Sequence, residues 1–318
     1  MELDPELKVI VDLANAAEPA ARSEAEVERF RAEFAGFASL LGSGSDDVQT
    51  TDASVPGPDG PIPVRSYRPR DDSAGPLGTL VWFHGGGWVI GDLDTHDALC
   101  RDLATGSAFG VLSVGYRLAP EHRFPAAHDA AEAVVALLLS DGEEVGVDPT
   151  RIAMGGDSAG GHLATVTARR LVERGGDLPD LRGQVLVYPV TDLAGHAGEH
   201  PSKDENAEGL LLTAATMDFF ADTYLPDQGR RAEPDASPLR APELGGLPPA
   251  LVVVASHDPL RDEGLAYARR LTEAGVPTEV EHLEGAVHLC AQMGATAVGR
   301  RVVERVSGFV SAVLSPAS

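Results

Sequence analysis

The sequence predicts an α/β fold in which a mostly parallel, twisted sheet carries helices on both faces. Short apolar runs typical of buried strands alternate with helical patterns over most of the 318 residues. One of these runs, at 152–154, passes through a Gly-x-Ser-x-Gly turn at 156–160 directly into a helical pattern. Such alternation is typical of parallel sheets, whose functional sites lie beyond the carboxyl ends of the strands. We therefore expect one large α/β domain with an insertion.

The first 45 residues carry apolar side chains at helical spacing. These side chains fall into two runs, Leu7 to Leu13 and Val27 to Phe37, with Pro19 between them. We therefore expect two amphipathic helices ahead of the main domain. The spacing fits a cap over an active site and plain packing helices equally well.

The main domain begins with a hairpin-type turn at 57–60, followed by an alternating strand at 62–67. Buried strands are then expected at 80–83, 111–116, 152–154, 185–189, 251–254 and 278–283. Helices are expected at 95–104, 125–139, 159–166, 265–274 and 298–313. Residues 191–246 break this alternation, since they are rich in Gly, Pro, Asp and Glu around one helical patch at 217–224. A long excursion within a compact domain is commonly functional, for instance a lid.

The charge balance and the cysteine count restrict the class of protein. The chain has 25 Lys and Arg against 49 Asp and Glu, a net charge of -24, which repels nucleic acids and anionic membranes. Its cysteines, Cys100 and Cys290, are too few for a disulfide framework or a cysteine-based metal site. The first residues are acidic, unlike a signal peptide, and no apolar run has the length of a membrane span. We therefore expect a soluble cytoplasmic protein that binds neither nucleic acid nor membrane.

The turn at 156–160 predicts a nucleophile elbow. In this arrangement a serine, here Ser158, stands on a sharp strand-to-helix turn that exposes its hydroxyl at the carboxyl edge of the sheet. Gly156 and Gly160 fit the turn because larger side chains would collide with the neighbouring strand and helix. The alternative for the motif alone is a glycine-rich turn in which Ser158 only caps the helix.

A run of three glycines, 85–87, follows the strand at 80–83 between His84 and Trp88. Glycine weakens strands, so a different use is expected. Without side chains in the way, the backbone N–H groups of such a loop can point inward as an oxyanion hole requires. His84 is expected to hold the loop through its ring nitrogens.

A serine nucleophile needs a base and an acid that orients the base. Asp258 lies two residues beyond the strand that ends near Ser256, at the edge where the elbow also lies. Asp262 and Glu263 are weaker candidates because they fall in the first turn of a helix, where carboxylates commonly interact with the helix dipole. For the base, His288 in the loop after the last strand is favoured over His282 within that strand.

One pattern has the form of a metal motif. His196, Glu199 and His200 fit the His-x-x-Glu-His pattern of an inverted zinc-protease motif. That motif needs a helix, which Gly195, Gly198 and Pro201 oppose. We therefore expect no metal site.

Five motifs lie along the chain: HGGGW at 84–88, YRLAPEH at 116–122, GDSAGG at 156–161, SPL at 237–239 and DPLRDEG at 258–264. Together they resemble the motifs of the hormone-sensitive lipase family of α/β-hydrolases, the bacterial family IV esterases. The resemblance runs from about residue 80 to the C-terminus.

This resemblance implies a carboxylesterase that acts on esters of short to medium acyl chains without a cofactor. It places Ser158, Asp258 and His288 in the triad and the oxyanion donors on the N–H groups of Gly86, Gly87 and Ala159. It implies a cap built from residues 1–45 and 191–225, with the catalytic domain at 46–318. Apart from the resemblance, Trp88 and Tyr188 are expected to line the pocket, although aromatic residues near strand ends are as often part of the core, and Asp157 is also expected to bind substrate. The chain departs from the family at Cys290, where an aromatic residue is usual, so the shape of the acyl pocket is not implied.

Other functions use the same residues. Amidases, lactonases and acyltransferases can operate the same triad, and a non-catalytic receptor for small molecules can share the fold. The strand at 278–283 is also an edge available for pairing with a second copy, so a homodimer is among the expected assemblies.

Overall fold

The computed structural model describes residues 2–16, 23–70, 75–105, 107–175 and 180–315. Its centre is an eight-stranded sheet with the strand order β1-β2-β4-β3-β5-β6-β7-β8. The strands are β1 (Val48–Val55), β2 (Ile62–Pro69), β3 (Leu77–Phe83), β4 (Gly110–Val114), β5 (Val147–Asp157), β6 (Gly183–Val187), β7 (Ala250–His257) and β8 (Thr278–Val287). β3 to β8 are parallel, whereas β2 pairs antiparallel with both β1 and β4. The predicted mostly parallel sheet is confirmed.

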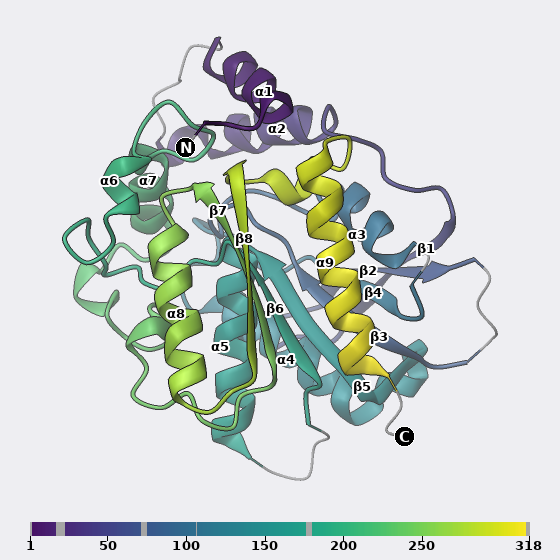
Figure 1. The fold of residues 1–318 in the computed structure, drawn as a ribbon. Coiled ribbons are helices and arrows are strands. Elements are labelled where there is room, and N and C mark those ends of the chain that lie inside the picture. Colours follow the sequence, from purple (N-terminus) through teal and green to yellow (C-terminus); the bar gives the residue numbers. More distant parts are fainter. Residues whose placement is uncertain (1, 17–22, 71–74, 106, 176–179, 316–318) are drawn as a thin grey trace.

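Helices cover both faces of the sheet, as expected. α3 (Asp97–Ala104) and α9 (Ala297–Leu314) pack on one face, and α4 (Ala126–Asp141), α5 (Ala159–Arg174) and α8 (Arg261–Glu273) pack on the other (Figure 1). Residues alternate between the two cores along β3: Leu80 and Trp82 join the core under α9, and Val81 and Phe83 join the core under α5. This period of two is the geometry of a strand that is buried on both faces.

A second group of helices lies beyond the carboxyl ends of β7 and β8. It consists of α1 (Pro5–Ala16), α2 (Val27–Ala38), α6 (Ser202–Glu205) and α7 (Ala214–Tyr224) (Figure 1). The N-terminal helices contact the later ones at two points. Asn15 Nδ2 of α1 donates to the Gly209 carbonyl oxygen at 2.9 Å, and the Phe30 ring of α2 stacks on the Phe220 ring of α7 at a centroid distance of 5.6 Å. The two predicted N-terminal helices are therefore present, and they contact the excursion after β6.

Short 3₁₀ turns complete the described secondary structure. They are η1 (Glu24–Glu26), η2 (Gly142–Val145), η3 (Gln228–Arg230), η4 (Pro238–Arg240) and η5 (Cys290–Gln292). No helix in the described ranges is long and apolar enough to cross a membrane.

The structure differs from the expectations in three elements. β1 was not expected, because only its end residues Val48 and Val55 are buried and the six between them are exposed. α6 has four residues, which is too short to produce a helical pattern. β8 continues to Val287 beside a register shift in its pairing with β7, so His288 directly follows the strand instead of standing in a longer loop.

Candidate active site

Ser158 stands at a tight turn between β5 and α5. Its backbone has φ 55° and ψ −118°, a region that residues other than glycine rarely adopt. A Cβ at Gly160 would lie 1.8 Å from the Phe83 carbonyl oxygen, and one at Gly156 would lie 2.4 Å from the same oxygen. Both glycines are therefore required by close packing against β3. The Ser158 side chain makes no capping hydrogen bond to α5, which argues against the helix-cap alternative.

The structure brings Ser158, His288 and Asp258 together. His288 Nε2 lies 3.0 Å from Ser158 Oγ, and His288 Nδ1 lies 2.8 Å from Asp258 Oδ2. The Asp258 side chain is fully buried, and its other oxygen accepts a hydrogen bond from the Leu260 amide at 2.9 Å. The three groups come from the ends of β5, β7 and β8, which share one edge of the sheet.

The competing carboxylates and histidine are occupied elsewhere. Asp262 pairs with Arg261 and accepts a hydrogen bond from the Ser202 amide. Glu263 accepts hydrogen bonds from the amides of residues 191 and 192 and pairs with Lys203 at 2.9 Å. His282 lies exposed on β8. The alternative acids, Asp262 and Glu263, thus have structural partners, and the alternative base, His282, lies at the surface.

The glycine loop after β3 borders the same cavity as Ser158. Gly86 has φ 115° and Gly87 has φ 58°, which suits glycine. A Cβ at Gly86 would lie 2.2 Å from the Ile90 carbonyl oxygen, and one at Gly87 would lie 2.2 Å from the Phe220 ring. The loop is therefore enclosed between its own following turn and α7, and Gly86 and Gly87 line the same cavity as Ser158.

Behind this loop lies a buried polar network. Asp157 is fully buried; its Oδ1 accepts a hydrogen bond from the Gly85 amide, and its Oδ2 lies 3.2 Å from His96 Nε2 and 3.3 Å from Gln292 Nε2. Burial raises the pKa of Asp157, but the interactions with His96, joined by those with His84 and Gln292, outweigh burial and hold that pKa below its usual value. The network links the elbow, the glycine loop and η5.

His84 holds the loop, as the sequence predicted. Its ring stacks on Tyr116 at 4.2 Å, its Nδ1 lies 2.8 Å from the Gly85 carbonyl oxygen, and its own carbonyl oxygen accepts a hydrogen bond from the Tyr116 hydroxyl. Burial, reinforced by the neighbouring His96, lowers the pKa of His84 to about 4. His84 is therefore a neutral structural group at neutral pH.

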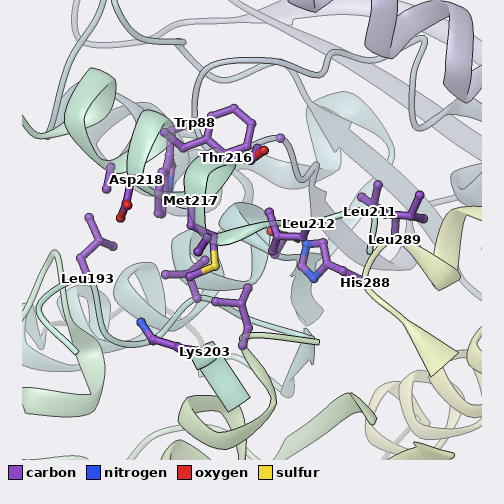
Figure 2. A pocket seen from close by; sticks show the side chains of 18 of the residues that line it. Trp88, Leu193, Lys203, Leu211, Leu212, Thr216, Met217, Asp218, His288 and Leu289 are labelled. Carbon is purple, nitrogen blue, oxygen red and sulfur yellow. Dashed lines mark hydrogen bonds between the residues drawn. The ribbon is translucent and has the colours of Figure 1, made fainter. Parts of the chain in front are cut away.

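A cavity of about 480 Å³ opens above Ser158 and His288. Figure 2 shows Trp88, Thr216 and Met217 on one side of it, and His288, Leu211 and Leu289 on another. Most of its wall is apolar, and the larger apolar residues come from five segments: Phe30, Phe34 and Phe37 of α2; Trp88 and Ile90 at and after the glycine loop; Leu193, Leu211 and Leu212 of the excursion; Met217 and Phe220 of α7; and Leu260 and Leu289 near the triad. Its size and lining are those of a small-molecule site.

The expected substrate-binding residues divide into two groups. Trp88 lines the cavity, but Asp157 and Tyr188 are fully buried and lie outside its wall. Tyr188 instead packs its ring 4.5 Å from the His288 ring and accepts a hydrogen bond from the Ala291 amide. The expectation of substrate contact is therefore wrong for Asp157 and Tyr188 in this structure, because both point under the site.

Cys290 is also fully buried and lies outside the wall, whereas its neighbour Leu289 lines the cavity. Sequence reasoning missed Leu289 and the cavity-lining residues of α2 and the excursion. The spacing of Val27 to Phe37 predicts an amphipathic face, but no local signal says what that face contacts.

The metal-like pattern at 196–200 does not form the motif's helix. Within the described part of the chain, Asp192, Glu199 and His200 do place ligand atoms within 4.8 Å of one another. However, Arg240 donates to both oxygens of Asp192 and to Glu199. Burial raises the pKa of Asp192, but His200 and Arg240 outweigh it and lower that pKa to about 2. The guanidinium already supplies the positive charge, so the cluster is an ion-pair network that does not fit a metal ion.

Comparisons with known proteins identify the family of the chain. The family Abhydrolase_3, described as having an alpha/beta hydrolase fold, matches residues 80–292. The chain is 46% identical over 247 residues to a carboxylic ester hydrolase, LipN, of Mycobacterium tuberculosis; the match covers 76% of this chain and 64% of that protein, so the chain spans less than two thirds of that relative. It is 38% identical over 301 residues to an ethyl acetate hydrolase of Pseudomonas putida, covering 92% of this chain and 93% of that protein.

Solved structures give the same result. A hyperthermophilic esterase from the archaeon Pyrobaculum calidifontis superposes with a TM-score of 0.91 at 36% identity, covering 99% of this chain and 100% of that one. A thermostable esterase from Pseudomonas putida superposes with a TM-score of 0.90 at 32% identity, covering 99% of both chains. The fold, the motifs and these matches together show that the chain belongs to the hormone-sensitive lipase family of α/β-hydrolases.

Proposed function

We propose that the protein is a serine carboxylesterase that hydrolyses esters of short to medium acyl chains through an acyl-enzyme on Ser158. The observation that carries the proposal is the hydrogen-bonded line from Ser158 Oγ through His288 to Asp258, at the floor of an apolar cavity. The relatives named as ester hydrolases support it.

The first half of the reaction transfers the acyl group to the enzyme. Ser158 Oγ bonds to the ester carbonyl carbon while its proton moves to His288 Nε2, and the carbonyl oxygen becomes an oxyanion. The N–H groups of Gly86, Gly87 and Ala159 stabilise that oxyanion. The carbon–alkoxy bond then breaks, and the leaving oxygen takes the proton from His288 Nε2.

The second half repeats these steps with water. Water gives a proton to His288 and attacks the acyl carbon, after which the bond to Ser158 Oγ breaks and the serine regains its proton. Asp258 stays ionised and fixes which ring nitrogen of His288 faces Ser158. No step needs a cofactor or a metal ion.

The cavity supports the proposed acyl range. Its volume of about 480 Å³ holds a small ester, and its apolar lining favours hydrocarbon groups over charged ones. We assign residues 1–45 and 191–225 as the two parts of a cap on the catalytic domain at 46–318, because α2 and α7 contribute to the roof of this cavity.

The test is the initial rate of hydrolysis of p-nitrophenyl esters from acetate to palmitate, measured beside Ser158→Ala. We expect a maximum at short or medium chains and a loss of several orders of magnitude in kcat in the variant, which retains only about 10³–10⁴-fold over water. Near-normal activity of Ser158→Ala would overturn the mechanism. Turnover of amides or lactones but no esters would favour the other triad-dependent hydrolases, and no turnover of any substrate would favour a receptor.

The remaining sequence-based expectations are part of the proposal. We infer a cytoplasmic location from the two cysteines, and no nucleic-acid partner from the net charge of -24. β8 is the last strand of the sheet and exposes Val280, which supports a homodimer through this edge. Light scattering on the purified protein tests the dimer.

A further inference from the structure

The reaction itself divides the cavity into two sides. His288 Nε2 must give its proton to the leaving alkoxy oxygen, so the alcohol group of the ester has to lie on the side of His288. The acyl group extends the other way, past the amides that hold the oxyanion. Figure 2 shows Leu211 and Leu289 beside His288, and Trp88, Thr216 and Met217 away from it.

Leu289 has an unusual backbone for a leucine. Its φ of 69° and ψ of 1° lie in the left-handed region, where a side chain with a Cβ is disfavoured. Among the described residues, the other positive-φ residues that are not glycine are Trp88, Ser158 and Tyr188, and each of them belongs to the site or packs on it. Strain that gathers at a site in this way points to a function for the strained residue.

The turn that carries Leu289 is fixed at both ends. On one side, His288 is bound to Asp258. On the other, the Gln292 amide donates to the Leu289 carbonyl oxygen at 3.0 Å, and the Gln292 side chain enters the buried network of Asp157 and His96. Leu289 therefore cannot relax its φ without moving the catalytic histidine or breaking this network, and its side chain is kept in the cavity wall.

We propose that Leu289, supported by Leu211 and Leu212, forms the wall against the alcohol group and sets which alcohols the enzyme accepts. This inference rests on the proposed esterase function. It predicts separate control of the two halves of the substrate: Leu289 acts on the alcohol, and Met217 of α7 acts on the acyl chain.

The experiment measures kcat/KM for two series of esters, by pH-stat, with Leu289→Ala and Met217→Ala as matched variants. One series keeps the acetyl group and changes the alcohol from ethyl to butyl and benzyl; the other keeps ethanol and changes the acyl group from acetyl to hexanoyl. For Leu289→Ala we expect the benzyl-to-ethyl ratio to rise roughly tenfold or more, the scale at which contacts in an apolar pocket discriminate. The hexanoyl-to-acetyl ratio should stay within about twofold of the unsubstituted protein.

Met217→Ala should give the reverse pattern. A second readout separates the two roles, because all acetates share one acyl-enzyme: Leu289→Ala should leave the rate of deacylation from the acetyl-enzyme unchanged. Leu289→Gly removes the side chain and also accepts the left-handed φ, so it should give the same shift in the alcohol ratio with a Tm at or above that of Leu289→Ala. It therefore serves as the test if the alanine variant does not fold.

The outcomes separate this inference from the proposed function. An active enzyme whose alcohol ratio stays within about twofold in both Leu289 variants, or whose acyl ratio shifts instead, overturns the inference alone. Absence of ester turnover by the unsubstituted protein overturns the proposed function and this inference together.

Discussion

The floor and the roof of the cavity are built from different kinds of interaction. At the floor, Ser158, Asp258 and His288 follow three strand ends directly, and hydrogen bonds of 2.8 and 3.0 Å align them. At the roof, α2 and α7 meet through aromatic rings, with Phe30 stacked on Phe220 and Phe220 packed on the Gly87 backbone. Hydrogen bonds fix direction and aromatic packing fixes shape, so we assign the chemistry to the floor and the fit of the acyl chain to the roof.

The two regions meet at α6 and at α7. Ser202 Oγ donates to the Pro259 carbonyl oxygen, Asn206 Nδ2 donates to the Asp258 carbonyl oxygen, and Lys203 pairs with Glu263. Further along, the Tyr224 ring stacks on Trp88 at 4.3 Å. The roof is therefore attached next to Asp258 and next to the glycine loop.

The largest expected effect of a change at the floor is on kcat. Asp258→Asn keeps the shape of the side chain but favours the wrong tautomer of His288, so we expect kcat to fall about 10⁴-fold with KM little changed. Steady-state kinetics on a short-chain ester measure both. A large rise in KM with kcat retained would show that Asp258 acts in substrate binding, which would contradict its assignment to the chemistry at the floor.

At the roof, Phe220→Ala should act on stability and selectivity. Phe220 is 8% exposed and contacts both Phe30 and the glycine loop. Its removal leaves a hole that should lower the free energy of unfolding by about 3–5 kcal/mol, and the maximum in acyl-chain length should broaden. Denaturant titration and the ester series measure these effects; Phe219→Ala, at a partly buried neighbour, is the control and should cost less.

Acid should weaken the junction between the two regions. Burial is the main cause that lowers the pKa of His162 to about 3 and the pKa of His128 well below its usual value. His162 accepts a hydrogen bond from the Trp88 indole, and His128 contacts the Tyr224 hydroxyl. The unfolded chain binds these protons at a pKa near 6.5 and the native protein does not, so stability falls as the pH drops below about 6.5. At pH 5 the neutral state of His162 should lower the free energy of unfolding by about 2 kcal/mol relative to its value above pH 7.

His162→Gln checks this assignment. Removing one neutral buried histidine should reduce the slope of unfolding free energy against pH, between about pH 6.5 and 5, by about 1.4 kcal/mol per pH unit. Urea titrations at several pH values provide the slopes. An unchanged slope in His162→Gln would show that this histidine is protonated in the native protein.

The smallest expected effect concerns Cys290. Because Cys290 is fully buried and outside the cavity wall, Cys290→Ala should leave the acyl-chain profile unchanged and lower stability by about 1 kcal/mol. The p-nitrophenyl ester series and a melting curve measure the two quantities. A changed profile would show that residues beneath the wall also shape the pocket.

The same contrast explains what the sequence predicted. Most of the sheet, the elbow and the grouping of Ser158, Asp258 and His288 follow from short local patterns, because each functional group is tied to the end of a strand by its neighbours in the chain. The Gly156 and Gly160 pattern is diagnostic because the backbone of β3 comes so close that no side chain fits.

The rest depends on contacts between distant segments. Phe30 and Phe220 are 190 positions apart in the sequence, and no local pattern states that their rings stack. Asp157 and Tyr188 both adjoin the ends of strands, but the tight turns there direct their side chains beneath the site. β1 was missed because an exposed edge strand lacks the apolar alternation that marks a half-buried one.

The most direct test of Ser158 as the nucleophile is covalent labelling by a fluorophosphonate, followed by intact-protein and peptide mass spectrometry. We expect one phosphonyl group per chain, attached to Ser158, with no labelling of Ser158→Ala and slower labelling of Asp258→Asn. A folded protein that remains unlabelled, or that carries the label on another residue, would contradict the assignment of Ser158 as the nucleophile at the floor of this cavity.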